Sequence, residues 1–262
     1  MDLKERYTIE DLIEILHRLR GENGCPWDRV QTHQSLKKGM IEEAYEAIDA
    51  LDNNDDKMFA NELGDVLLQV VFHAVLADER NAFDFNVILK EVCDKLITRH
   101  THVFGEVKAD NASEALTTWE ANKKREKGQK SYSEMICDIP KALPALLSSE
   151  KIQKKAAGSG FDWDNSADVL EKVKEEIAEL EEALKSEGEE RAAEEYGDVL
   201  FSMVNLGRHL GVTPEIELMN ANRKFTDRFC RMERLAMAEN HTLDDLDAEE
   251  MDELWEKIKK NS

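Results

Sequence analysis

Helix-breaking residues are scarce in this sequence, whose 262 residues include only 12 glycines and 4 prolines. Between them lie long stretches rich in Ala, Glu, Leu and Lys, residues that favour helix. The sequence also lacks runs that alternate between apolar and polar residues and end in turn signals, as half-buried strands do. These absences exclude a fold built mainly from β-sheet, and the sequence predicts an all-α protein.

Cysteines and long apolar segments are also few. The 4 cysteines form no CxxC pair and no recognisable metal-binding spacing, which favours free thiols in a reducing compartment. Residues 1–6 contain no apolar signal core. The longest apolar stretch, residues 66–77, is interrupted by Gln69 and His73 and is too short to span a bilayer. We therefore expect a cytoplasmic protein with no membrane partner.

Basic residues are outnumbered, with 35 Lys and Arg against 57 Asp and Glu, and the formal net charge is −22. A polyanionic surface repels nucleic-acid backbones and acidic membranes. This charge balance argues against a nucleic-acid polymer as partner. It leaves room for a small anionic substrate, provided that metal ions and a few local cations receive it.

The second half of the chain repeats the first. An E-E-x-x-E motif at residues 42–46 and an E-x-x-D motif at 62–65 recur at 175–179 and 195–198, with the same offset for all four acid positions. A G-x-x-W-D motif and a W-E-x-x-K motif recur as well, at slightly different offsets. We infer two homologous lobes, residues 1–125 and 138–262, joined by a polar linker at 126–137.

Each lobe is expected to be a bundle of helices. Apolar side chains in residues 41–51 recur every three or four positions, which is typical of an amphipathic helix, and residues 63–71 form a second, more apolar one. Further helices are predicted at about 9–20 and 84–99, with counterparts in the second lobe.

The repeated acids are candidate metal ligands. Residues three or four apart share a helix face, so antiparallel packing of two successive helices would bring both carboxylate pairs of a lobe together. The first-lobe set is Glu43, Glu46, Glu62 and Asp65, and the second-lobe set is Glu176, Glu179, Glu195 and Asp198.

One E-E-x-x-E motif in so acidic a chain is usually a solvated helix face, but two observations favour metal. Asp65 lies in an apolar helix, where an ionised carboxylate is costly unless it is paired or coordinated. Chance acidity would also not repeat four positions at one spacing. Four converging carboxylates repel one another unless cations intervene. Oxygen ligands without His or Cys suit Mg²⁺ or Mn²⁺.

The paired acid motifs, the G-C-P-W-D motif at 24–28 and the duplication of the whole chain resemble the MazG nucleoside triphosphate pyrophosphohydrolases. The resemblance covers nearly all of the chain. It implies an all-α bundle completed by homodimerisation, dependence on Mg²⁺, and hydrolysis of NTP or dNTP to the monophosphate and pyrophosphate. It also implies a role in cleansing the nucleotide pool.

Carried over by position, the resemblance makes the four second-lobe acids the metal ligands. It assigns nucleotide contacts to Lys172, Glu175, Arg191, Glu194, Lys224, Arg228, Trp255 and Lys259. Metal would lower the pKa of a bound water that attacks the α-phosphorus, and Lys224 and Arg228 would neutralise the leaving pyrophosphate. Glu175 is the candidate for orienting or deprotonating that water.

The two lobes are not equivalent at every position. At the offset that relates the acids, Lys172 aligns with Gly39 and Arg191 with Met58, so the first lobe lacks two cations. We therefore expect the second lobe to be the main catalyst.

Two alternatives stay open. A non-catalytic acidic module would bind metal or a partner protein without turnover, but it does not explain why cations recur beside the acids. A more specialised dUTPase-like or histidine-pathway pyrophosphohydrolase is the other alternative.

Overall fold

The structure is a computed structural model that describes residues 3–129, 131–186 and 188–260. Helices account for all the regular secondary structure in these ranges, and no strand occurs in them. The chain divides into two compact units, Met1–Arg125 and Glu126–Ser262. The predicted all-α fold with two helical lobes is confirmed.

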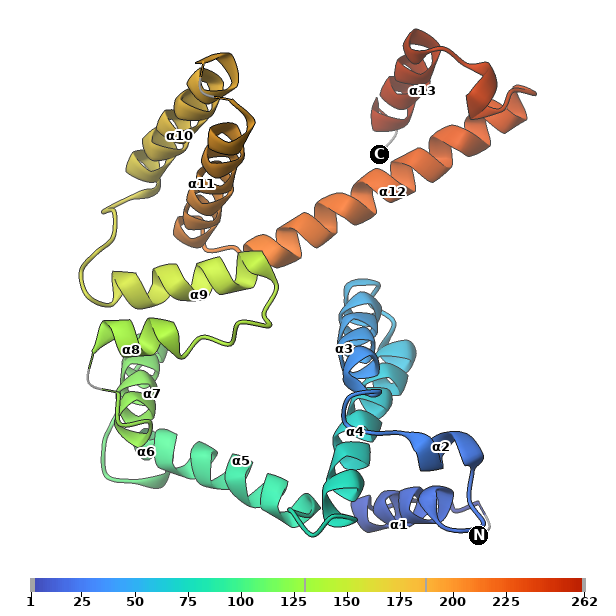
Figure 1. Ribbon diagram of the computed structural model, residues 1–262, viewed down its shortest axis with the longest axis vertical. Helices are drawn as coiled ribbons and strands as arrows, with labels where there is room; N and C mark the ends of the chain where they lie inside the picture. Colours follow the sequence, from blue (N-terminus) through green and yellow to red (C-terminus); the bar gives the residue numbers. More distant parts are fainter. Residues whose placement is uncertain (1–2, 130, 187, 261–262) are drawn as a thin grey trace. The chain divides into compact units, whose positions relative to one another are not determined.

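In residues 3–126 the first lobe forms seven helices, which Figure 1 labels α1 to α7. They are α1 (Ile9–Arg20), α2 (Pro26–Val30), α3 (Lys37–Asp52), α4 (Asp56–Asp78), α5 (Phe85–Arg99), α6 (Thr101–Phe104) and α7 (Ala112–Glu126). The expected helices at 9–20 and 84–99 correspond to α1 and α5. Thr8 begins α1 with a capping box, in which its hydroxyl accepts from the backbone N–H of Asp11 and the Asp11 side chain accepts from that of Thr8.

The core of the first lobe forms where α1 and the second half of α4 meet. Leu16 of α1 packs with Val71, Phe72 and Val75 of α4, and all four side chains are buried. On the other side of the lobe α3 and α4 lie side by side and are joined by residues 53–55 (Figure 1). The buried residues of α3, Ala47 and Ala50, are small and allow the two helices to approach closely. The hairpin thereby brings the two acid motifs of the lobe onto facing helices.

Helix α4 is longer than the apolar stretch seen in the sequence. Among the described residues it is the one helix long and apolar enough to cross a membrane by length and composition. Its buried half, however, supplies the core of the lobe, while its first half carries Glu62 and Asp65. The helix therefore contributes both to the core of the lobe and to its acid cluster.

The second lobe contains the remaining helices. They are α8 (Tyr132–Cys137), α9 (Ala145–Ala157), α10 (Ser166–Ser186), α11 (Glu189–His209), α12 (Pro214–Ala238), a 3₁₀ turn η1 (Leu243–Asp245) and α13 (Ala248–Lys260). Part of the stretch expected to be a linker is helical, because Ser131 and Glu134 form a capping box that begins α8.

Two packed pairs of helices build the second lobe. Helices α10 and α11 form a hairpin that matches α3 and α4, and they bury Val169, Val173 and Val204. Helix α9 packs against α11 and α12, and α13 packs along α12 (Figure 1). The α12–α13 pair has its own core, in which Met232 and Leu254 are buried.

Candidate metal and nucleotide site

Three carboxylates of the second lobe converge between α10 and α11. One oxygen each from Glu176, Glu179 and Glu195 lies within 4.8 Å of the others. Glu176 is 8% exposed and Glu195 only 2%, although both are acids. Asp198 lies outside this close group, yet its charge raises the pKa of Glu195, so it stands near enough to contribute to the same field. The structure thus brings three of the four predicted acids of this lobe into one close group, and the fourth, Asp198, acts on it electrostatically.

Two cations lie against these acids, one from each helix. On α10, Lys172 Nζ is 2.9 Å from Glu176 Oε1 and 2.7 Å from Glu175 Oε1. On α11, Arg191 forms an ion pair with Glu195, and its Nη1 is 2.6 Å from Glu194 Oε2. Each cation therefore bridges one buried acid and one exposed acid of its own helix.

The pKa of Glu195 reflects these neighbours. Burial raises it above the ordinary 4.5, the charge of Arg191 opposes that rise, and Glu179, Asp198 and Glu176 add to it. Burial and like charges favour protonation of a carboxyl group. A divalent cation bound among these oxygens would favour their ionised forms and offset the repulsion between them.

The matching cluster of the first lobe lies between α3 and α4. Oxygens of Glu43, Glu62 and Asp65 lie within 4.8 Å of one another. The neutral side chain of Asn61 reaches two of them, with Nδ2 3.3 Å from Asp65 and 3.4 Å from Glu62. Burial first, and then the charges of Glu46 and the other acids, raise the pKa of Glu43. The fold therefore repeats the acid cluster with Gly39 and Met58 at the positions that match Lys172 and Arg191, while Lys38 pairs with Glu42 at 2.7 Å.

The other predicted nucleotide contacts lie on the α12–α13 pair. Trp255 is partly buried against the α12–α13 core, with its ring centroid 5.2 Å from that of Phe225. Lys259 Nζ pairs with Glu256 at 2.5 Å, and Lys224 and Arg228 lie on α12. Within the lobe the acids are thus gathered by α10 and α11 alone, and the remaining contacts are carried by a different helix pair.

The first-lobe counterparts of Arg228, Trp255 and Lys259 form a cation–π group. The guanidinium of Arg99 lies 5.4 Å from the ring centroid of Trp119, and Lys123 Nζ lies 4.6 Å from it. Tryptophans in the G-x-x-W-D motifs behave differently. Trp27 is 63% exposed and Trp163 is 38% exposed, so neither side chain lies in a core.

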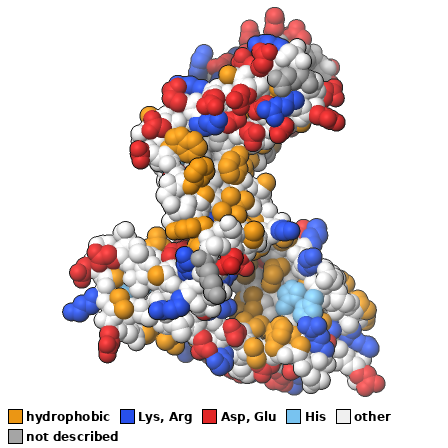
Figure 2. Space-filling model, turned by 60° about the vertical axis from the view of Figure 1, so that its left-hand side comes forward, with side chains coloured by type: hydrophobic (Ala, Val, Ile, Leu, Met, Phe, Trp, Pro, Cys, Tyr) orange, Lys and Arg blue, Asp and Glu red, His pale blue; other side chains and the backbone are white. Residues whose placement is uncertain are grey.

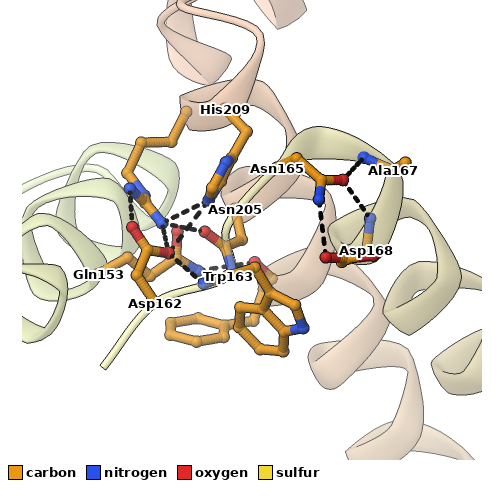
Figure 3. Close-up of polar contacts among 10 residues, drawn as sticks. Gln153, Asp162, Trp163, Asn165, Ala167, Asp168, Asn205 and His209 are labelled. Atoms are coloured by element: carbon orange, nitrogen blue, oxygen red, sulfur yellow. Dashed lines mark hydrogen bonds and ion pairs between the residues drawn. The ribbon is translucent and has the colours of Figure 1, made fainter. Parts of the chain in front are cut away.

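One polar group at the start of the second lobe was missed in the sequence. Both terminal nitrogens of Arg208 donate to the Asp162 carboxylate, Nη1 at 2.9 Å from Oδ2. His209 Nε2 lies 3.0 Å from the same carboxylate (Figure 3). Arg208 also donates to Asn205 at 2.6 Å. Hydrogen bonds from Arg208 and His209 lower the pKa of Asp162 to about 2. The group fixes the loop before α10 to the end of α11, and the position of Asp162 inside the G-x-x-W-D motif was the available signal.

Comparison with known proteins agrees with this arrangement. The nucleoside triphosphate pyrophosphohydrolase/pyrophosphatase MazG of Thermotoga maritima is 47% identical over 250 residues, which cover 95% of each chain. The nucleoside triphosphate pyrophosphohydrolase of Escherichia coli K12 is 44% identical over 96% of this chain and 97% of its own. This chain belongs to the MazG family. It is an enzyme of the pyrophosphohydrolase class, as the resemblance in its motifs predicted.

Two family profiles match this chain in tandem. The one described as "MazG nucleotide pyrophosphohydrolase domain" matches residues 31–104, which include the first acid cluster. The one described as "Phosphoribosyl-ATP pyrophosphohydrolase" matches residues 147–225, which include the second. A protein named YabN from Bacillus subtilis is 44% identical over 94% of this chain, which corresponds to 50% of its own length. Both lobes therefore derive from pyrophosphohydrolase domains.

Proposed function

We propose that the chain hydrolyses nucleoside triphosphates, NTP or dNTP, to the monophosphate and pyrophosphate at the α10–α11 cluster, with Mg²⁺ as cofactor and Mn²⁺ as a substitute. The observation that carries the proposal is the convergence of Glu179 with two buried acids, Glu176 and Glu195. Buried carboxylates that approach one another are costly unless a cation joins them. A role in removing unwanted nucleotides from the pool follows from this reaction.

The donor set fits a hard divalent ion. Its side chains offer only carboxylate oxygens, the ligands that Mg²⁺ and Mn²⁺ prefer. The residues that would hold the metal are Glu176, Glu179, Glu195 and Asp198. When bound, the metal would neutralise phosphate oxygens and acidify a water molecule.

The side chains around the cluster complete the site. Lys172 and Arg191 place positive charge at its edge, where they would bind phosphate oxygens. Glu175, exposed beside the ligand Glu176, would orient or deprotonate the attacking water. Substrate contacts at the other assigned positions require α12 and α13. Those positions are Lys224, Arg228, Trp255 and Lys259, whereas Glu194 lies on α11 beside Arg191.

The exposed apolar surface of α10 supports a homodimer, and we expect this dimer to be cytoplasmic. Leu170, Ile177 and Leu184 recur at seven-residue spacing along α10 and are 42%, 42% and 70% exposed. Figure 2, which brings the side of the molecule with α10 and α11 forward, shows hydrophobic side chains on the surface beside mixed acidic and basic ones. A stripe of this kind favours a second helical layer supplied by another copy. Light scattering at several concentrations measures whether the chain is dimeric.

The second lobe is the main catalyst in this proposal. It carries Lys172 and Arg191, whereas Gly39 and Met58 stand at the matching positions of the first lobe. The first lobe would be weaker, differently specific or chiefly structural.

Product analysis tests the proposed reaction. The full chain is incubated with each NTP and dNTP, and with phosphoribosyl-ATP because of the second profile, in the presence of Mg²⁺ or EDTA. Monophosphate and pyrophosphate that form only with metal support the proposal. Diphosphate and orthophosphate would contradict the site of cleavage. A folded, metal-loaded chain with no turnover on any nucleotide would instead support a non-catalytic metal-binding module.

A further inference from the structure

The cations of the second cluster follow one local pattern on both helices. A cation stands first, an exposed acid follows three positions later, and a buried acid follows at the fourth: Lys172, Glu175, Glu176 on α10 and Arg191, Glu194, Glu195 on α11. Residues separated by three and four positions share a helix face. Each cation therefore reaches both of its acids at once, and the two helices present this arrangement to the same cluster.

The buried acid of each set is a candidate metal ligand, whereas the exposed one lies outside the close group of oxygens. Glu175 and Glu194 have side chains 57% and 63% exposed, against 11% for Glu176 and 2% for Glu195. A metal ion and a cation from the protein cannot both neutralise one buried carboxylate without repelling each other. A bound metal ion and the protein cations would therefore compete for the carboxylates of Glu176 and Glu195.

We propose that Lys172 and Arg191 are exchangeable counterions of the metal cluster. They neutralise Glu176 and Glu195 while these carboxylates hold no metal. When a divalent ion takes the buried carboxylates, each cation keeps its exposed acid and turns toward the phosphates of the substrate. This inference rests on the proposed function, since it assumes that the cluster binds metal.

The consequence is a positive coupling between metal and polyphosphate. In the free enzyme a metal ion has to displace two protein cations, which weakens its binding. A bound polyphosphate attracts the same two cations, and this leaves the carboxylates to the metal. Coupling of this kind is reciprocal, so metal also tightens the binding of polyphosphate. The cluster would then fill with metal chiefly when substrate is present.

The first lobe gives the internal contrast. Its matching acids, Glu43 and Glu62, are half-buried, and Gly39 and Met58 stand where the second lobe has its cations. Loss of the cations therefore leaves the repulsion among the first-lobe acids without the same compensation.

Binding of Mn²⁺ without nucleotide tests the inference. Free Mn²⁺ is measured by its electron paramagnetic resonance signal in the full chain carrying Glu62→Gln and Asp65→Asn, which disable the first cluster. Lys172→Met and Arg191→Met are each expected to tighten Mn²⁺ binding by about tenfold. Lys174→Met is the matched control, because Lys174 also forms an ion pair on α10, with Glu171 at 2.8 Å, but outside the cluster.

Charge-preserving variants separate this effect from damage to the fold. Arg191→Lys is expected to keep the Mn²⁺ affinity close to that of its parent, while circular dichroism confirms that all variants remain helical. Unchanged or weaker Mn²⁺ binding in both Lys172→Met and Arg191→Met would overturn the inference alone. Mn²⁺ binding that survives Glu176→Gln together with Glu195→Gln would overturn the proposed metal site, and the inference with it.

Discussion

The Nδ1 atoms of His33 and His73 lie 2.8 Å apart, and the two rings are stacked with their planes 4° from parallel. One nitrogen of such a pair has to donate and the other has to accept, so both rings cannot be protonated there. The buried Nε2 of His33 has no hydrogen-bond partner among the described residues. The two rings therefore share a single proton between their Nδ1 atoms.

We predict that this pair makes the stability of the protein depend on pH. Burial, followed by the charge of His33, lowers the pKa of His73 below its ordinary 6.5. The unfolded chain then binds more protons than the folded one as the pH falls through 6.5, so the free energy of unfolding decreases on acidification. Urea denaturation at a series of pH values measures this slope. His73→Leu is expected to reduce the slope near 6.5, and an unchanged slope would contradict the assignment.

A second prediction concerns the loop before α10. Asp162→Asn weakens the contacts to Arg208 and His209, and we expect the free energy of unfolding to fall by about 2 kcal/mol, the size of a charge-assisted hydrogen bond. Because the pKa of Asp162 is lowered to about 2 from 3.8, its contribution is fully present above 3.8 and is lost as the pH falls toward 2. Asp164→Asn, an exposed neighbour in the same loop, is the control. Equal effects of the two substitutions would refute the role of Asp162.

Much of the fold was predictable because its signals are local. Repeated spacing placed Glu176 and Glu195 on facing helices, and apolar periodicity marked the helices that carry them. The Asp162–Arg208 contact was not predictable, because it joins residues far apart in sequence and has no periodicity. The same holds for His33 and His73. Helical spacing of three and four residues predicts that Lys172 and Arg191 pair with the acids. The family resemblance instead implied that both residues contact the nucleotide.

A third prediction transfers the counterion pattern to the first lobe. Met58 is 52% exposed and stands four positions before Glu62, as Arg191 stands before Glu195. Met58→Arg is expected to weaken Mn²⁺ binding at the first cluster by several-fold, because the new guanidinium competes for Glu62. The measurement uses the full chain with Glu176→Gln and Glu195→Gln, so that only the first cluster contributes.

Met58→Leu is the control for that substitution, since it keeps the apolar surface without adding charge. It is expected to leave the Mn²⁺ affinity unchanged. Tighter binding in Met58→Arg, or equal weakening in both variants, would show that a cation at this position does not compete with metal.

The assignment of catalysis to the second lobe is tested most directly by matched variants of the two clusters. Glu176→Gln and Glu43→Gln change the same position of the repeat in the second and first lobes, and pyrophosphate release from nucleoside triphosphate is measured for each with Mg²⁺. We predict that Glu176→Gln lowers the rate by about two orders of magnitude or more, whereas Glu43→Gln retains most of it. Loss of turnover in Glu43→Gln with near-normal rates in Glu176→Gln would contradict the account.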